Sequence, residues 1–365
     1  MQKIRLKKQT KRADKTLLIL VFLLTGLGLI VVADASAPIA LHSFSDKYYF
    51  VKQQAVWGLI GITGLFLISK IKYTFWEKIA NPLFLGTVIL LVLVLIPGFS
   101  SKLLGARRWL TFGPISFQPS EFIKLSLAVY LSKVASYDKK LLSYLIPLIA
   151  VSTLIMLQPD LGTTIVILAL GLVQLFVSGV NPFYLGGLTA IAGIIGYILI
   201  ISSPYRKARL ITFLEQTTDP LGKGYHIRQI LYALGAGGFF GVGLGQSRQK
   251  YLFLPEAATD SIFAIIAEEA GFLGATFIII LFAIFIYRGI VIAKSAPDKF
   301  SKILAVGMTT WIGGQAFLNI AAMVSLVPLT GIPLPFFSYG GSSLTTVLFA
   351  CGILLNISRY ESKEK

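Results

Sequence analysis

Long apolar runs recur along the chain, and they limit the folds that it can adopt. Each run is close to the ~20 residues that a helix needs to cross the hydrocarbon of a bilayer. Apolar residues make up 55% of the 365 residues and charged residues only 13%, and no soluble domain of this size could bury so much apolar surface. We therefore predict an all-α polytopic membrane protein with about ten transmembrane helices, since these runs are too long for strands. The helices are expected near residues 16–35, 54–70, 79–97, 119–135, 143–158, 162–178, 184–202, 262–287, 303–325 and 341–358.

The distribution of lysine and arginine between the loops predicts the orientation. By these boundaries, 20 of the basic residues lie on the side that carries the N-terminus and 12 on the other. The excess indicates that both termini face the cytoplasm. Residues 1–15 then form a basic cytoplasmic tail, and the whole chain, 1–365, is interpreted as one integral-membrane domain.

A hydrophilic segment at residues 203–261 separates the predicted helices 7 and 8 and is expected to lie outside the cytoplasm. Segments of this length are usually functional or disordered. Disorder fits poorly, because apolar residues such as Ile230, Tyr232 and Phe240 are available for packing. We expect short amphipathic helices that rest on the membrane.

Composition also excludes several classes of protein. The net charge is +17, but the basic residues sit mainly at the ends of apolar segments, which is typical of membrane topology and anionic lipid rather than of nucleic-acid binding. Cys351 is the only cysteine, so neither an intrachain disulfide nor a thiolate metal cluster is possible. His42 and His226 are far apart in sequence, which argues against a histidine-based zinc site.

Arg107 and Arg108 lie in the loop after the third predicted helix, next to Trp109. Guanidinium groups match phosphate oxygens in a bidentate manner, so this pair can bind a phosphorylated substrate. The alternative is that the arginines hold lipid headgroups and that Trp109 belongs to an interfacial aromatic belt. Sequence does not decide between the two.

Glu121 and Lys124 are three residues apart and share one face of the fourth predicted helix. They can neutralise each other as an ion pair. Alternatively, Lys124 also reaches a carboxylate of the 203–261 segment and holds it ionised. Asp160 follows Gln158-Pro159 in a tight turn, where it can cap the sixth predicted helix or line a cavity.

Asp260 stands immediately before an apolar run, behind seven lysine and arginine residues of the 203–261 segment. An acidic group at a membrane boundary is a functional hypothesis by default, here for an anionic, membrane-borne substrate. The structural alternative is that Asp260 or Thr259 caps the following helix. Two further acids, Glu268 and Glu269, lie within that helix and need partners. Residues 331–343 break the helix between the last two predicted spans, and Gln315 and Asn319 share one face of the ninth predicted helix.

Four stretches carry a resemblance to a known family: GARRWLTFGPISFQPSEFIK (105–124), QPDLGT (158–163), GVGLGQSRQKYLFLPEAATDSIFAIIAEEAGFLG (241–274) and PLTGIPLPFFSYGGSS (328–343). Together they resemble the SEDS family of peptidoglycan polymerases, whose main branches are FtsW and RodA and which also includes SpoVE. ARRW, LFVSGV (175–180) and residues 205–225 favour the FtsW branch, whereas GIPLPF (331–336) and QPDLGT are closer to RodA. Ala258-Thr259-Asp260-Ser261 departs from the His-Thr-Asp-Phe that is usual in the family but keeps the aspartate.

The resemblance implies a reaction in which lipid II units are joined and undecaprenyl pyrophosphate is released, with Asp260 at the position of the essential aspartate. An attacking sugar hydroxyl needs a base or an orienting carboxylate, and a pyrophosphate leaving group needs cations. Supporting or substrate-binding roles are expected for Lys124, Glu121, Arg107, Arg108, Asp160, Lys250 and Glu256.

The resemblance also implies a setting for the reaction. The expected location is the bacterial cytoplasmic membrane, with the active site facing outside the cytoplasm. A divalent cation, Mg or Mn, is allowed as a helper, although the chain shows no ligand set that establishes it. The expected partners are a class B penicillin-binding protein and other division or elongation proteins. The alternatives to a division polymerase are a RodA-type elongation polymerase, a lipid II flippase or transporter, and a scaffold for division proteins.

Overall fold

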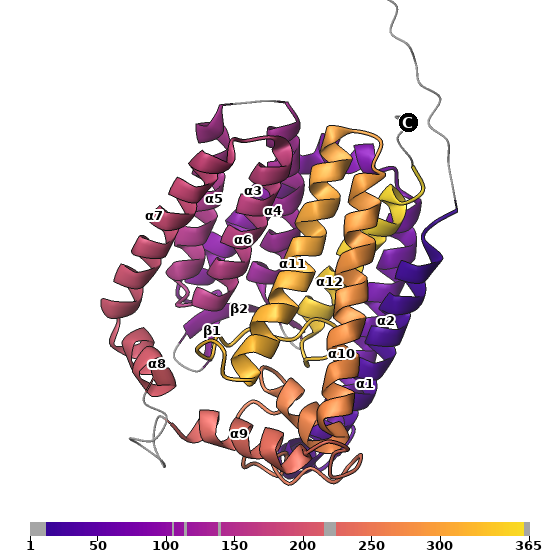
Figure 1. Cartoon of the computed structure of the whole chain (residues 1–365), viewed down its shortest axis with the longest axis vertical. Helices are drawn as coiled ribbons and strands as arrows, with labels where there is room; N and C mark the ends of the chain where they lie inside the picture. Colours follow the sequence, from indigo (N-terminus) through magenta and orange to yellow (C-terminus); the bar gives the residue numbers. More distant parts are fainter. Residues whose placement is uncertain (1–11, 104–105, 113–114, 138–139, 215–223, 361–365) are drawn as a thin grey trace, which may run out of the picture.

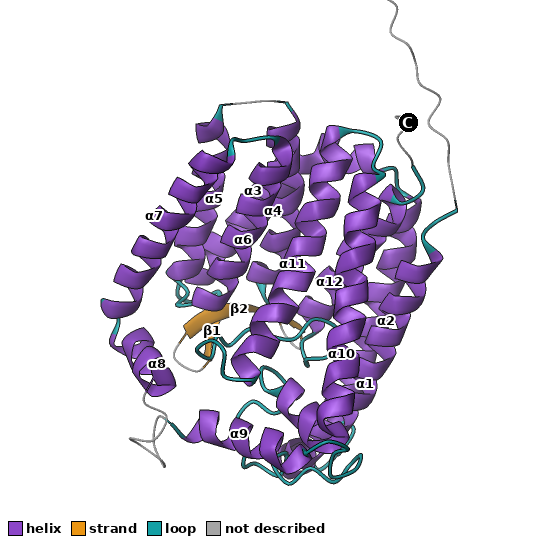
Figure 2. Cartoon of the chain, in the orientation of Figure 1, coloured by secondary structure: helices purple, strands orange, loops and turns teal. Residues whose placement is uncertain are grey.

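The computed structural model describes residues 12–103, 106–112, 115–137, 140–214 and 224–360. Within them, ten longer helices form one bundle (Figures 1 and 2). Their bounds are α1 (Lys15–Phe44), α2 (Tyr49–Lys70), α3 (Tyr73–Leu95), α4 (Pro119–Ser136), α5 (Leu141–Met156), α6 (Leu161–Ser178), α7 (Pro182–Ile201), α10 (Ile262–Lys294), α11 (Lys299–Met323) and α12 (Gly341–Ile357).

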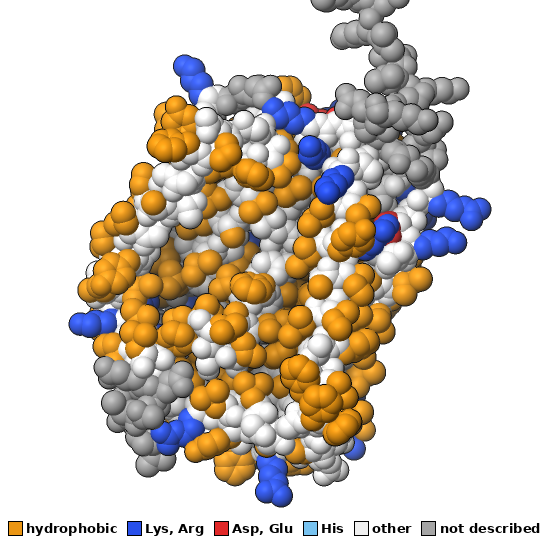
Figure 3. Space-filling view, in the orientation of Figure 1, with side chains coloured by type: hydrophobic (Ala, Val, Ile, Leu, Met, Phe, Trp, Pro, Cys, Tyr) orange, Lys and Arg blue, Asp and Glu red, His pale blue; other side chains and the backbone are white. Residues whose placement is uncertain are grey.

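Seven of the described helices, namely α1, α2, α3, α6, α7, α10 and α11, are long and apolar enough to cross a membrane. α5 and α12 are apolar but shorter, and α4 carries Glu121, Lys124 and Lys133. Each of the ten predicted runs coincides with one of the bundle helices. The number of spans and the N-in, C-in orientation stay predictions. Figure 3 shows apolar side chains over most of one face of the bundle and lysine and arginine mainly toward its ends.

The core of the bundle is built around α11 and α12. α11 packs against α4, α6 and α10, and α12 packs along α2. α7 makes its contacts with α6 and α8 and leans away from the rest in Figure 1. Small residues allow close approach between backbones, as is common between membrane helices. A Cβ on Gly28 of α1, for example, would collide with the main-chain carbonyl of Phe336.

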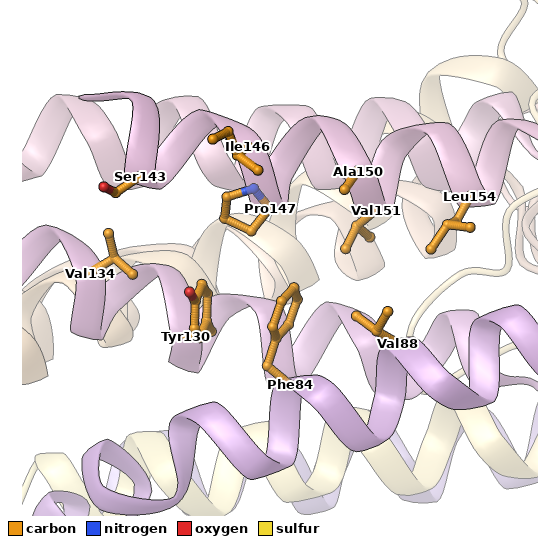
Figure 4. A pocket seen from close by; sticks show the side chains of 10 residues that line it. All are labelled: Phe84, Val88, Tyr130, Val134, Ser143, Ile146, Pro147, Ala150, Val151 and Leu154. Carbon is orange, nitrogen blue, oxygen red and sulfur yellow. The ribbon is translucent and has the colours of Figure 1, made fainter. Parts of the chain in front are cut away.

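An apolar cavity of about 460 Å³ lies between α3, α4 and α5 (Figure 4). Phe84, Tyr130 and Pro147 are among its lining residues. Ser143 and the hydroxyl of Tyr130 are its polar side-chain groups, so it carries no group that is suited to acid–base catalysis at neutral pH.

The loop between α3 and α4 contains a small sheet, which sequence analysis did not predict. β1 (Ser100–Leu103), β2 (Ala106–Phe112) and β3 (Ile115–Phe117) are antiparallel in the order β1-β2-β3, with Leu110 opposite both Ser100 and Phe117. These strands are short and basic, and they lack the clear apolar–polar alternation by which a strand is recognised in sequence.

The predicted 203–261 segment contains two short helices among its described residues, α8 (Pro204–Leu214) and α9 (Tyr225–Gly237). Residues 215–223 lie outside the described residues, as do residues 1–11 of the predicted basic tail. α8, α9 and the sheet lie at the end of the bundle opposite to the C-terminus (Figure 1). Their position relative to a membrane stays a prediction.

The glycine-rich loop after α9, residues 238–245, packs against a break in α10. Gly271 has non-helical dihedral angles, φ 65° and ψ −164°, and a Cβ there would collide with the backbone of Gly241. The N–H of Val242 donates to the Glu268 carbonyl at 3.0 Å, and the N–H of Phe272 donates to the Gly238 carbonyl at 2.9 Å. The glycine-rich loop thus satisfies the backbone groups that the break exposes.

Candidate active site

Asp260 lies in the turn that leads into α10, and its main chain is held from α11. The side-chain Nδ2 of Asn319 donates to the Asp260 carbonyl at 2.8 Å and to the Ile332 carbonyl at 2.8 Å. Ser338 donates to the Thr259 carbonyl at 2.5 Å. The turn that carries Asp260 is therefore hydrogen-bonded to α11 and to the irregular segment between α11 and α12.

The side chain of Asp260 is not a helix cap. The N-cap of α10 is Ser261, which makes no side-chain capping bond, and Thr259 donates instead to the Glu256 carboxylate at 2.7 Å. A carboxylate that does not cap its helix needs another explanation. The structural alternative raised by the sequence therefore fails for both Asp260 and Thr259.

The Asp260 carboxyl faces an arginine that sequence analysis did not single out. A Cβ built on Gly331 would lie 3.5 Å from Oδ2 of Asp260 and 3.6 Å from Nη1 of Arg209, so both groups meet over this glycine. Gly331 has φ +73°, a conformation that favours glycine. Arg209 comes from α8 and donates to the Leu329 carbonyl at 3.0 Å.

The surroundings of Asp260 raise the pKa of its carboxyl from 3.8 to about 7. Burial has the largest effect, and the negative charges of Glu256 and then Asp160 add to it. Arg209 and Arg108 act in the opposite direction. A carboxyl with a pKa near 7 can both accept and return a proton at neutral pH, which is what general acid–base catalysis requires.

Asp160 and Arg108 organise the turn between α5 and α6. Asp160 is buried and caps α6, accepting from the N–H of Thr163 at 3.0 Å and from its hydroxyl at 2.9 Å. The capping interpretation is thus confirmed. Arg108 donates from Nε to the Gln158 carbonyl at 2.9 Å and from Nη2 to the Pro159 carbonyl at 2.7 Å. This arginine is therefore held in place by the main chain.

Arg107 and Arg108 are neighbours in β2. The register between β1 and β2 shifts here, because Ser101 pairs with Trp109 and Lys102 pairs with Arg107, so Arg108 is the extra residue of a β-bulge. Of the two arginines, Arg108 is the one held by the α5–α6 turn and the one whose charge affects the Asp260 carboxyl. Binding of a phosphate by the pair stays a prediction.

Lys124 is a buried structural cation. Its ammonium donates to Glu121 at 2.7 Å and to Gln315 at 2.8 Å, and it lies 5.3 Å from the centroid of the Trp311 ring. The ion-pair interpretation of Glu121 and Lys124 is confirmed. The expected proximity of Lys124 to Asp260 does not appear among these contacts, since the buried Glu121 and Gln315 take up the ammonium.

Lys250 also departs from expectation, because it faces inward. Its ammonium is buried and pairs with Asp34 of α1 at 2.7 Å and with Glu269 of α10 at 2.8 Å. Glu268 accepts from the N–H of Arg248 at 3.1 Å. The 245–250 turn is thus bonded to α10. The ammonium of Lys250 is paired with two carboxylates of the protein, so it serves packing rather than the expected binding of substrate. Glu256, by contrast, is exposed near Asp260.

His226 is a second residue that the sequence did not reveal. It lies on α9, and its Nε2 is 2.8 Å from the hydroxyl of Ser261, next to Asp260. Burial, and then the charge of Arg209, lowers the pKa of His226 to about 4, so the ring is neutral at pH 7. The sequence showed only that His226 and Arg209 belong to the 203–261 segment. Their separation from Asp260 along the chain did not indicate that they lie near it.

A divalent cation, which the resemblance allowed, finds no ready site here. Among the residues that the structure describes, no group of three His, Cys, Asp or Glu side chains is placed to hold a metal ion. Asp260, Glu256 and Asp160 influence one another electrostatically without forming such a group.

The FtsW/RodA/SpoVE family of cell cycle proteins matches residues 15–363. The chain belongs to this family. Stage V sporulation protein E of Bacillus subtilis is 44% identical over 357 residues, which cover 95% of this chain and 97% of that protein. A probable peptidoglycan glycosyltransferase FtsW of Trichlorobacter lovleyi is 41% identical over 355 residues, covering 94% and 93%. The predicted family is confirmed, and so, at the level of the family, is the predicted enzyme class of peptidoglycan glycosyltransferase.

Solved structures of the FtsW/RodA/SpoVE family have the same fold. A chain from a peptidoglycan synthase complex that coordinates polymerization and crosslinking superposes with a TM-score of 0.78 at 29% identity, covering 95% of this chain and 98% of that one. The rod shape determining protein RodA of Thermus thermophilus superposes with a TM-score of 0.71 at 26% identity, covering 95% and 97%. The bundle described here is therefore the fold of this family.

Proposed function

We propose that this protein polymerises peptidoglycan glycan strands from lipid II and releases undecaprenyl pyrophosphate, with Asp260 as the catalytic carboxylate. The observation that carries the proposal is the Asp260 carboxyl itself, with a pKa of about 7, beside Arg209 and under the influence of Arg108. A base that titrates near neutral pH and cations close to it are the two requirements of glycosyl transfer from a pyrophosphate.

In the proposed reaction, a sugar hydroxyl attacks the anomeric carbon that bears the pyrophosphate. A carbon–oxygen bond forms, and the bond from that carbon to the phosphate oxygen breaks. The proton of the hydroxyl passes to Asp260, and the electron pair leaves with the pyrophosphate. Arg209 then stabilises the negative charge that develops on the leaving group.

Other members of the site have positioning roles in this proposal. Asn319 fixes the main chain of Asp260, and Arg108 holds the α5–α6 turn from which Asp160 acts on the carboxyl. Lys124 and Glu121 act at a distance, because Gln315, which accepts from Lys124, donates to the Pro333 carbonyl at 2.9 Å. The negative charge of the exposed Glu256 adds to the effect of burial in raising the pKa of the Asp260 carboxyl.

The proposed setting is the bacterial cytoplasmic membrane, with Asp260 facing outside the cytoplasm. A class B penicillin-binding protein is the proposed partner, which is in keeping with a structural relative that belongs to a complex for polymerization and crosslinking. We propose a role in cell division, since relatives of more than 40% identity include an FtsW, and an elongation role remains the alternative.

The test is polymerisation by the purified protein, together with its partner, in liposomes that contain fluorescent lipid II. The proposal predicts glycan strands that a muramidase degrades. Transfer of lipid II across the bilayer without any polymer would instead establish a transporter. If the protein neither transferred nor polymerised lipid II while its partner still crosslinked, the result would contradict the proposal and indicate a scaffold.

A further inference from the structure

A polar cavity of about 320 Å³ lies at the end of the bundle where α1 begins and α12 ends, opposite to the end that carries α8 and α9 (Figure 1). Its lining residues come from three separate parts of the chain: the residues around the start of α1, the end of α10 and the residues after α12. They include Arg12, Lys15, Arg288, Ser295, Ser358 and Tyr360. Three of these six side chains are cationic and three carry a hydroxyl group.

Asp14 holds this cavity in shape. Its carboxylate caps α1 by accepting from the N–H of Leu17 at 2.8 Å, and it forms an ion pair with Nη2 of Arg288. Its own N–H donates to the hydroxyl of Ser358 at 3.0 Å. One residue therefore ties α1 to α10 and to the C-terminal end of α12, so the lining groups are positioned before any ligand arrives.

Among the described residues that line the cavity, positive charges outnumber negative ones. Three cations, Arg12, Lys15 and Arg288, face one carboxylate, that of Asp14. Neither Arg12 nor Lys15 has an ion-pair partner within the described part of the chain. Nε of Arg288 is buried and has no hydrogen-bond partner there. Buried donors are nearly always satisfied in native proteins, so this N–H calls for an acceptor.

We propose that this cavity binds a phosphate group, and that the group is the headgroup phosphate of an anionic phospholipid. Guanidinium and ammonium donors flanked by hydroxyls are the groups that recognise phosphate oxygens. The volume corresponds to roughly ten water molecules at about 30 Å³ each, which is enough for a phosphate with its glycerol. Val291 and Ile292 add apolar wall, which suits the lipid end of such a ligand.

The experiment measures ligand-dependent thermal stabilisation of the purified full-length protein in detergent. The probes are a short-chain phosphatidylglycerol, a diacylglycerol of the same chain length, glycerol 3-phosphate and inorganic phosphate. The test variant is Arg12→Gln/Lys15→Gln, which leaves the Asp14–Arg288 pair intact. The matched control is Lys70→Gln/Lys72→Gln, which removes two cations that are exposed near the same end of the bundle.

We expect phosphatidylglycerol to stabilise the native protein and the control, and the test variant to bind it about 30-fold more weakly. Stabilisation by glycerol 3-phosphate or inorganic phosphate alone, lost in the test variant, would keep the phosphate site but assign it to a soluble ligand. Equal binding by the test variant and the native protein would overturn the proposal, as would equal stabilisation by diacylglycerol.

A second variant guards against a general loss of folding. Arg288→Lys keeps a cation beside Asp14 but removes the buried Nε–H. Weaker binding of phosphatidylglycerol with an unchanged Tm in the absence of ligand is the expected result. Unchanged binding in this variant as well as in Arg12→Gln/Lys15→Gln would show that the cavity does not recognise phosphate.

Discussion

Asn319 donates one side-chain amide to the main-chain carbonyl of Asp260, at 2.8 Å, and to that of Ile332, at the same distance. A single residue of α11 thus fixes both the turn that carries the carboxyl and the segment that carries Gly331. The relative position of Asp260 and Arg209 depends on these two chain segments. Asn319 is therefore a positioning residue, which acts on the reaction through the backbone.

Asn319→Ala should lower the polymerisation rate at saturating lipid II more than it changes the apparent affinity. Two buried carbonyls would lose their donor, at a cost of about 1–3 kcal/mol in the free energy of unfolding. Asn81→Ala is the control, since the exposed Asn81 accepts a hydrogen bond from Lys133 outside the site. A native rate in Asn319→Ala would contradict the positioning role.

Gly331→Ala should reduce activity strongly while the bundle stays folded. The new methyl group would lie between Asp260 and Arg209, at 3.5 and 3.6 Å, and φ +73° adds strain of about 1 kcal/mol. Gly98→Ala is a matched control, because Gly98 has φ +102° but nothing within 4 Å of its added Cβ. An equal loss of activity in the two variants would mean that backbone strain alone explains it, rather than the contact of the new methyl group with Asp260 and Arg209.

The raised pKa of Asp260 predicts two opposite dependences on pH. The rate should rise as the pH passes through about 7, because the carboxylate is the base. The free energy of unfolding should change in the opposite direction. The carboxyl has a higher pKa in the native state than in the unfolded state, so it binds its proton more tightly when the protein is folded. Its contribution to stability is therefore full below pH ~4 and is lost as the pH rises through about 7. Measuring Tm as a function of pH for the native protein and for Asp260→Asn isolates this contribution. If Tm depended on pH identically in the two proteins, the raised pKa of Asp260 would be contradicted.

Lys250→Met should destabilise the fold rather than weaken lipid II use. Removing one partner of a buried ion pair costs about 3–5 kcal/mol, because Glu269 would remain buried, and Asp34 partly buried, without their cation. Adding Asp34→Asn should restore part of the loss in Tm. A normal Tm with a raised KM for lipid II would instead return Lys250 to the substrate-binding role that its sequence suggested.

The helices of the bundle could be predicted because apolar runs of membrane length leave few alternatives. The fourth run, expected at 119–135, forms α4 at Pro119–Ser136. α1 extends to Phe44, beyond the expected end at 35, because Pro38 and the polar residues around it do not interrupt the helix. The sheet at β1–β3 gave no such signal, because its strands contain 4, 7 and 3 residues.

The site could be predicted only in part. Asp260 stood out because a carboxylate at a membrane boundary is unusual, and Asp160 because it precedes a helix. Lys250 was expected to support substrate binding because sequence cannot show that Asp34 and Glu269 take up its charge. For Lys124, the sequence left open both the ion pair with Glu121, which the structure contains, and a role beside Asp260. Arg209 lies close to Asp260, and His226 contacts its neighbour Ser261, because of where α8 and α9 run in the fold. No local sequence pattern predicts that course of the chain.

Asp260→Asn tests the central claim most directly. Asparagine has nearly the same shape but cannot act as a base, and the native carboxyl makes no capping bond that it would have to replace. The measurement is the rate at which the purified variant, with its partner, polymerises fluorescent lipid II in liposomes, alongside its Tm. The account predicts a folded protein whose rate falls by at least about 100-fold. Polymerisation at close to the native rate would show that Asp260 is not the catalytic carboxylate.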